Sequence, residues 1–249
     1  MAKKEKKKDG VFYRIIIAVL ILIIAFCLYK IGTILYEYHV GTKEYDSIQQ
    51  LAGIEENSFT GEVDFDALVK KNRDVKAWIY SKDTVINYPV VQGRDNQYYL
   101  YRMINGEMNG KGSIFIDYRC EKPFEDFNTI IYGHRMKDGS MFNSLTKYRD
   151  KDYFDKHKTM LLTTLKQKYN VEVFGVVTIA ADSDKYQYQF SGKTDRQAYL
   201  DWIKAESEID TGVHASADDH IVMLSTCTYE FDDARLVVFG KLVEMEENK

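Results

Sequence analysis

A long apolar segment near the N-terminus constrains this chain more than any other feature. Residues 11–36 are mostly apolar, with Arg14 near one end and Lys30 near the other. The lysine-rich run KKEKKK precedes the segment at residues 3–8. A helix needs roughly 20 apolar residues to cross a bilayer core, and a basic side chain near its end can extend its charge to the interface. The segment is therefore predicted to be a transmembrane signal anchor.

The basic residues predict how this helix is oriented. Cytoplasmic flanks carry an excess of lysine and arginine, so residues 1–10 are expected in the cytoplasm and the chain after residue 36 outside the cell. A cleaved signal peptide would need a small-x-small site, whereas YKIGTILYEYHV follows the apolar core at residues 29–40. A buried core helix would rarely be so uniformly apolar beside a lysine block. An uncleaved, single-pass anchor in the cell membrane is favoured over both alternatives.

The rest of the chain has the composition of an ordinary globular domain. Residues 37–62 are interpreted as a stalk with a helical region, and residues 63–249 as one extracellular catalytic domain with enough length for a core. Charged residues make up 29% of the chain, and the net charge is −4. The lysines beyond the anchor are scattered among acidic residues, so nucleic-acid binding is not expected.

The pattern of the outer domain is mainly that of β-strands. Short helices are expected at 64–71, 95–104, 140–148, 151–158 and 194–208. Apolar and β-branched runs separated by turn residues predict about eight strands. We expect these at 75–81, 85–93, 113–119, 128–134, 160–167, 169–180, 220–229 and 234–246. Helices do not alternate regularly with strands, so a mainly antiparallel closed β-barrel with helical additions is favoured over a doubly wound parallel sheet.

Cysteine usage narrows the chemistry. Cys27 lies in the predicted anchor, while Cys120 and Cys227 lie in the outer domain. A single disulfide between the last two stays open, and a buried structural thiol is the commonest use of a free cysteine. Cys227 ends the motif LSTC after an apolar run, where a strand leaves the core and a thiol can reach a cleft. The spacings C-x-x-C and H-x-x-x-H do not occur, so neither a metal site nor a cofactor is expected.

Arg235 is a candidate partner of this thiol. If the last two strands form a hairpin centred near Phe231, Cys227 and Arg235 lie opposite each other on the same face. A guanidinium in that position would lower the pKa of the thiol and could donate hydrogen bonds to an oxyanion. The simpler interpretation is a solvated arginine that pairs with an aspartate of the turn, so the sequence leaves both open.

His134 is the histidine best placed to act with Cys227. It ends the predicted strand 128–134, and the adjacent Gly133 permits a tight bend. His220 shares the strand of Cys227, but an offset of seven residues puts it on the opposite face. The other three histidines lie near the membrane or in polar segments. Periodicity alone does not bring His134 next to Cys227.

Several motifs taken together resemble a known family. NTIIYGHRMKDGSMF at 128–142, LSTC at 224–227 and ARLVVFGKLV at 234–243 are similar to the class B sortases of Gram-positive bacteria. The segments SIFIDYR at 113–119 and VVQGRDNQYYL at 90–100 also resemble that family. No single motif is specific, but their order along about residues 64–243 is.

The resemblance implies a sortase-like β-barrel and a cysteine transpeptidase. Such enzymes cleave a C-terminal sorting signal of LPxTG or NPxTN type after its threonine. They then join the threonine carbonyl to an amine of a peptidoglycan precursor or of a pilin, so the implied partners are surface proteins that carry such a signal. The resemblance assigns Cys227 as nucleophile, His134 as acid/base and Arg235 as oxyanion stabiliser. It places Asn96, Leu100, Tyr132 and Ser225 along the substrate groove, and the Thr228 amide is a further expected oxyanion donor.

Two other functions use the same residues. In an exported thiol peptidase, water would resolve the thioester, and the sequence barely distinguishes this from transfer to an amine. In a non-catalytic surface binding module, Cys227 would be a structural thiol.

Overall fold

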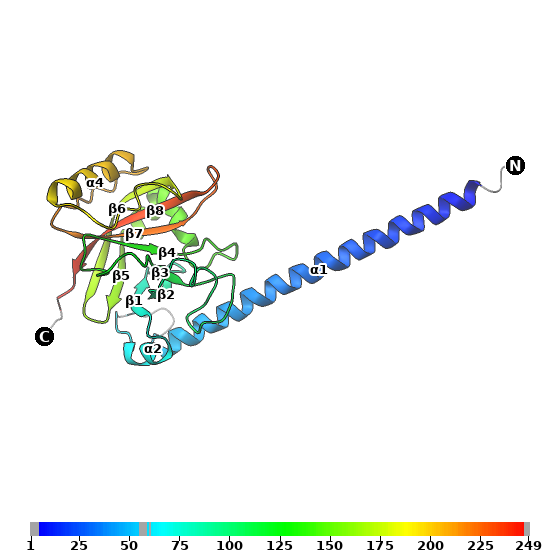
Figure 1. Ribbon diagram of the computed structural model, residues 1–249, viewed down its shortest axis with the longest axis horizontal. Coiled ribbons are helices and arrows are strands. Elements are labelled where there is room, and N and C mark those ends of the chain that lie inside the picture. The colour runs from blue at the N-terminus through cyan, green and yellow to red at the C-terminus, as the bar shows by residue number, and fades with distance from the viewer. Residues whose placement is uncertain (1–4, 55–58, 60, 247–249) are drawn as a thin grey trace. The chain divides into compact units, whose positions relative to one another are not determined.

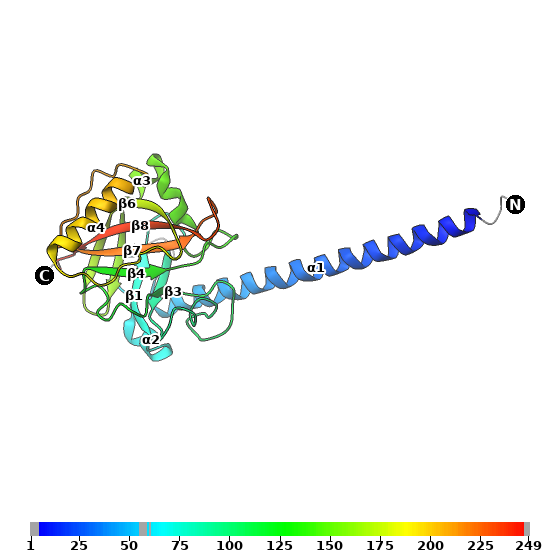
Figure 2. The same cartoon turned by 45° about the horizontal axis from the view of Figure 1, so that its top comes forward.

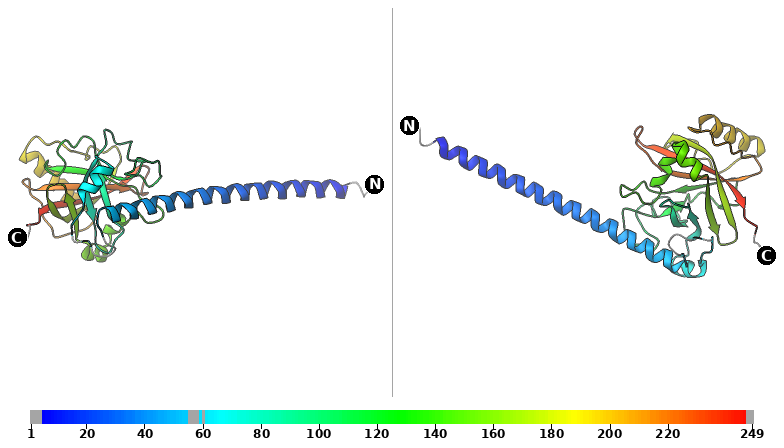
Figure 3. Two further views of the ribbon diagram at one scale, coloured as in Figure 1. Left: turned by 90° about the horizontal axis from the view of Figure 1, so that it is seen from below. Right: turned by 180° about the vertical axis from the view of Figure 1, so that it is seen from behind.

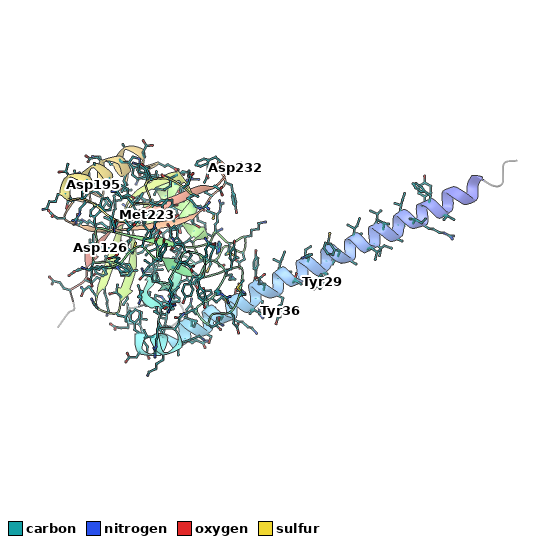
Figure 4. All side chains as sticks on the ribbon, in the orientation of Figure 1. Tyr29, Tyr36, Asp126, Asp195, Met223 and Asp232 are labelled. Carbon is teal, nitrogen blue, oxygen red and sulfur yellow. The ribbon has the colours of Figure 1, made fainter. Side chains whose placement is uncertain are left out.

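The computed structural model describes residues 5–54, 59 and 61–246, which form two units. Residues up to Lys43 belong to the first unit, and the second begins at Glu44. Helix α1 (Glu5–Leu51) is continuous. Within the described part of the chain, it is the one helix long and apolar enough to cross a membrane. Tyr29 and Tyr36 project from it and are exposed (Figure 4).

The strands of the second unit close into a barrel (Figures 1 and 2). In the described residues these are β1 (Val75–Tyr80), β2 (Asn87–Val91), β3 (Ile114–Ile116), β4 (Asn128–Tyr132), β5 (Thr159–Thr164), β6 (Lys168–Ala180), β7 (His220–Cys227) and β8 (Ala234–Glu244). Their order around the barrel is β1-β2-β3-β4-β7-β8-β6-β5. The β2–β3 and β4–β7 pairs are parallel, whereas the remaining neighbours are antiparallel. The prediction of a mainly β, closed barrel with about eight strands is confirmed.

Short helices decorate the barrel, close to where the sequence predicted them. They are α2 (Phe65–Lys71), the 3-10 helix η1 (Asn143–Arg149), α3 (Lys151–Lys156) and α4 (Lys193–Glu206). Asp64 caps α2 by accepting a hydrogen bond from the Ala67 amide at 2.9 Å, as its position before the helix predicts. Figure 3 shows α4 outside the strands from two sides.

The helix predicted over residues 95–104 is wrong. The Asp95 carboxylate accepts hydrogen bonds from the two amides that lie two and three residues further on, each at 2.8 Å. A short polar side chain that binds nearby amides competes with helix formation. The segment therefore forms turns and returns through an antiparallel bridge between Arg102 and Met108.

The segment expected to be a stalk, residues 37–62, contributes to the barrel unit. From Glu44 onward it belongs to the barrel unit. Ile48, near the end of α1, is fully buried and joins a core cluster with Leu68 of α2 and Trp78 of β1. Complete burial of one such side chain contributes roughly 1.5–3 kcal/mol. The end of α1 is thus part of the domain core, while residues 55–58 and 60 lie outside the described residues.

Candidate active site

Three neighbouring strands bring the predicted catalytic residues to one edge of the barrel. β4 and β7 run parallel, with Tyr132 opposite Ser225. The Gly133 amide continues this ladder by donating to the Ser225 carbonyl at 3.1 Å, so the same register carries His134 alongside Cys227. β7 and β8 run antiparallel, and Cys227 lies directly opposite Arg235. The hairpin register predicted from the sequence is therefore confirmed.

A single cavity of about 260 Å³ contains these three side chains. Its walls come from β3, β4, β7, β8, the segment 95–104 and the connection between β6 and β7. The predicted residues that line it are His134, Cys227 and Arg235 together with Asn96, Leu100, Tyr132 and Ser225. Residues from six separate parts of the sequence thus share one cleft, which is the arrangement that a thiol, an imidazole and a guanidinium need in order to act together.

Gly133 is required by close packing. A Cβ atom at this position would lie 2.5 Å from side-chain atoms of both Ile114 and Phe142. The Gly133 carbonyl also accepts a hydrogen bond from the Thr226 hydroxyl at 2.8 Å. The backbone before His134 is therefore held against the strand that carries Cys227. The tight bend expected at Gly133 does not need a left-handed conformation, because its φ is not positive.

The His134 ring is oriented by a backbone carbonyl. Its Nε2 lies 2.6 Å from the Leu100 carbonyl oxygen, and since a carbonyl only accepts, Nε2 carries the proton. In the neutral ring this leaves Nδ1 as the basic nitrogen. The Tyr101 ring lies beside the imidazole, with 5.9 Å between the ring centroids. Within the described residues, His134 is the one histidine that lines the cavity.

The two cysteines of the domain have different surroundings. Both are free thiols, so the disulfide left open by the sequence is not formed. Cys120 is buried, and burial raises the pKa of its thiol to about 11. A thiol with a raised pKa is a poor nucleophile near neutral pH. Cys227 is half-buried and lines the cavity, so it is the cysteine with access to a substrate.

Thr228 does not meet the expectation that its amide donates to the oxyanion formed from the bound substrate. It is buried and does not line the cavity. Its amide donates to the Ala234 carbonyl at 3.0 Å, and its hydroxyl donates to the Glu230 carboxylate. Because the amide is already used to close the turn between β7 and β8, it is not available to an oxyanion. Arg235 remains as the predicted donor.

Tyr186 is a cavity residue that the sequence analysis missed. Its hydroxyl lies 2.8 Å from the Ser225 hydroxyl oxygen, and its ring lies 5.8 Å from that of Tyr132. Burial raises the pKa of Tyr186 to about 12, although Ser225 and Arg235 act to lower it. The alternating aromatics of YQYQF at 186–190 were the signal for an ordered wall, but they lie in a segment that reads as a polar insertion.

A buried carboxylate supports Tyr132. The Tyr132 hydroxyl donates to Asp117 at 2.9 Å, and Arg119 donates to the same carboxylate through two nitrogens at 2.9 and 2.7 Å. Burial alone would raise the pKa of Asp117, but the hydrogen bonds, chiefly those from Arg119, outweigh it and lower the pKa. Asp117 therefore stays ionised and holds the Tyr132 ring in the cavity wall.

The chain is similar in sequence and in fold to known proteins. The sortase domain family model matches residues 81–243. Sortase B of Listeria monocytogenes is 43% identical over 178 residues, which cover 71% of this chain and 72% of the relative. A Bacillus anthracis crystal structure described as similar to sortase B is 41% identical, with a TM-score of 0.75, and covers 84% of this chain and 98% of that one.

A Staphylococcus aureus sortase B–substrate complex has a TM-score of 0.75 at 31% identity and covers 85% of this chain and 100% of that one. The family match includes β4, β7 and β8, and with them His134 just after β4, Cys227 of β7 and Arg235 of β8. The chain therefore belongs to the sortase family, within class B, and is a sortase cysteine transpeptidase.

Proposed function

We propose that this enzyme cleaves a C-terminal sorting signal of LPxTG or NPxTN type after its threonine and transfers the threonine carbonyl to an amine. The acceptor amine belongs to a peptidoglycan precursor or a pilin, and the reaction anchors surface proteins. The observation that carries this proposal is the convergence of His134, Cys227 and Arg235 in one cavity from three adjacent strands.

The first half-reaction forms a thioester. The thiol proton of Cys227 passes to His134, and the thiolate sulfur attacks the threonine carbonyl carbon. Arg235 donates to the oxyanion that develops on the carbonyl oxygen. When the scissile C–N bond breaks, the imidazolium of His134 gives its proton to the departing amine.

The second half-reaction reverses the proton movements. The acceptor amine attacks the thioester carbonyl, and His134 removes a proton from the attacking nitrogen. The C–S bond breaks, and the proton returns to the Cys227 sulfur. The net result exchanges one amide for another, so no oxidant, metal or nucleotide is consumed.

The size and lining of the cavity favour an extended peptide. A volume of about 260 Å³ accommodates a few residues and no folded domain. Leu100, Tyr132 and Tyr186 offer apolar and aromatic surface. The Asn96 side-chain oxygen already accepts a hydrogen bond from the Tyr118 amide at 3.1 Å, so its NH₂ group is the part that can donate to a peptide carbonyl.

The apolar helix fits a membrane anchor, and we propose the orientation that the lysine cluster predicts. Residues 1–10 would then lie in the cytoplasm, residues 11–36 would cross the bilayer, and the domain assigned to 63–249 would face the cell exterior. Protease added to intact protoplasts should degrade the barrel unit. If the barrel unit survives until the membrane is permeabilised, the orientation is the opposite of the one proposed.

The chemistry is tested with a sorting peptide in the presence and absence of an amine acceptor. The wild-type protein should produce ligated peptide, whereas Cys227→Ala should produce none although its circular dichroism is unchanged. Cys120→Ala is the matched control and should retain activity, because that thiol is buried away from the cavity. Hydrolysis that is indifferent to the amine would identify a thiol peptidase, and full activity of Cys227→Ala would exclude covalent catalysis at this thiol.

Arg235→Lys tests the oxyanion role. A lysine keeps the charge but loses the planar fork of donors, so kcat should fall roughly 10²-fold while KM changes little. A change confined to KM would show that Arg235 binds the substrate without stabilising the transition state.

A further inference from the structure

The hydrogen-bond acceptor that orients His134 is a backbone carbonyl in an irregular segment. The Leu100 carbonyl lies in residues 95–113, which contain neither helix nor regular strand. A carbonyl in such a segment orients an imidazole only if other contacts hold the segment in place. We call residues 95–113 the acceptor loop.

Gly112 packs directly against the Leu100 carbonyl. It has a φ of +57°, and a Cβ atom there would lie 2.4 Å from the Leu100 oxygen and 2.8 Å from the Tyr99 oxygen. The adjacent Ser113 amide donates to the Tyr99 carbonyl at 2.9 Å. The C-terminal end of the acceptor loop therefore contacts the backbone of Tyr99 and Leu100, so the position of Gly112 restricts the position of the Leu100 carbonyl.

Tyr45 holds Gly112 from the end of α1. Its hydroxyl donates to the Gly112 carbonyl and lies 3.4 Å from the Ser113 hydroxyl oxygen. The side chain is 4% exposed, and its ring packs edge-on against Tyr88 at 5.2 Å. Tyr45 belongs to the barrel unit, although it continues the same helix that contains the predicted membrane span.

A second clamp fixes the acceptor loop on its other side. The buried Lys111 ammonium donates to Asp138 at 2.6 Å and to Ser140 at 3.0 Å. Both acceptors lie shortly after His134 in the chain. With this side fixed by an ion pair, the Tyr45 hydroxyl is a contact that ties the loop to the end of α1.

We infer that Tyr45 is a positioning residue for catalysis, acting through Gly112 and the Leu100 carbonyl to hold the His134 ring in the tautomer with the proton on Nε2. The inference rests on the proposed function, because it assigns His134 the acid/base role. If the loop shifts, the imidazole loses its fixed hydrogen-bond acceptor, and both ring tautomers become populated. The end of the anchor helix is then part of the catalytic apparatus as well as of the core.

The test compares Tyr45→Phe with Tyr36→Phe in the full chain in detergent micelles. The phenylalanine at 45 keeps the buried ring and removes only the hydroxyl. Tyr36 is on the same helix, exposed, and serves as the matched control. Loss of one positioning hydrogen bond should lower kcat for peptide ligation about three- to tenfold, with KM within twofold of wild type. Tyr36→Phe should match wild type in both constants.

A spectroscopic measurement separates positioning from stability. Long-range ¹H–¹⁵N correlation of labelled histidines at pH 8, in a Cys227→Ala background, reports the tautomer of His134 without turnover. It should show the Nε2–H form in the otherwise unmodified protein and a mixture of tautomers in Tyr45→Phe. An unchanged kcat, a change confined to KM, or an unchanged tautomer would each overturn the inference, whatever the melting temperature. Absence of ligation by wild type and both tyrosine variants would instead refute the proposed function.

Discussion

Replacing Asp138 by asparagine removes the charge of one member of a buried ion pair next to the active site. The partner, Lys111, has a side chain only 2% exposed, and that of Asp138 is 24% exposed. Asparagine keeps the shape of the side chain and an oxygen that can accept from the Ser140 amide, now 3.0 Å from Asp138. The substitution therefore isolates the electrostatic contribution from packing.

The expected loss in the free energy of unfolding follows from the burial of this ion pair. At 2.6 Å and an effective dielectric constant of 20, the attraction is about 6 kcal/mol, most of which desolvation offsets. Removing one partner of a buried pair costs about 3–5 kcal/mol, because the remaining charge loses part of what offset its burial. Asp138 is partly exposed and Ser140 still accepts from Lys111, so we expect the lower end, about 3 kcal/mol. In a domain of this size that lowers Tm by about 6–12 °C.

The cost should depend on pH in a defined direction. Burial alone would raise the pKa of Asp138, but the hydrogen bonds from Lys111 and Ser140 outweigh it and lower the pKa. A carboxyl group with a lowered pKa contributes stability that is complete above its unfolded pKa near ~3.9 and is lost as the pH falls through the folded pKa. The difference between wild type and Asp138→Asn should be constant from pH 7 to about 5 and shrink below about 4.

Urea unfolding of residues 38–249, followed by the fluorescence of the buried Trp78, measures these differences. A double-mutant cycle with Asp138→Asn, Lys111→Met and both together should give a double mutant less destabilised than the sum of the singles by at least about 1 kcal/mol. A cost of Asp138→Asn below about 0.5 kcal/mol at pH 7, with additive singles, would refute the claim that the pair is electrostatically buried.

Three further substitutions test other contacts. Gly133→Ala would force a Cβ to within 2.5 Å of neighbouring side chains, so urea unfolding should show a loss of about 1–3 kcal/mol; an unchanged midpoint would contradict the packing argument. Tyr186→Phe removes the hydroxyl contact with Ser225, so peptide titrations should show KM rising about threefold or more with kcat nearly unchanged. The Arg149 hydrogen bond lowers the pKa of Glu230 to about 2, yet Glu230 is exposed and Arg149 is only half-buried. Glu230→Gln should therefore cost less than about 1 kcal/mol at pH 7 in thermal melts, and this small difference should vanish as the pH falls from about 4 toward 2.

The strand pattern and most helices could be read from the sequence because they depend on local periodicity and capping. β7 and β8 are apolar runs that begin and end near the predicted residues, and α2 starts after Asp64 as the cap requires. The helix predicted at 95–104 fails to form for a local reason as well, because the Asp95 carboxylate accepts hydrogen bonds from nearby amides and competes with the helix. Apolar residues of that segment are instead buried by tertiary contacts.

The pairing of Cys227 with Arg235 could be predicted from the sequence, whereas the position of His134 beside them was decided by the fold. Cys227 and Arg235 face each other because a short turn fixes the register of an antiparallel hairpin, which is a local property. The position of His134, on the other side of Cys227, depends on β4 lying parallel to β7. The β5–β6 hairpin and α4 come between these two strands in the chain. No periodicity encodes a pairing between such distant strands, because it arises only when the barrel closes around its core. That closure places His134 beside the thiol, and it also brings the Leu100 carbonyl to the imidazole and the end of α1 to Gly112.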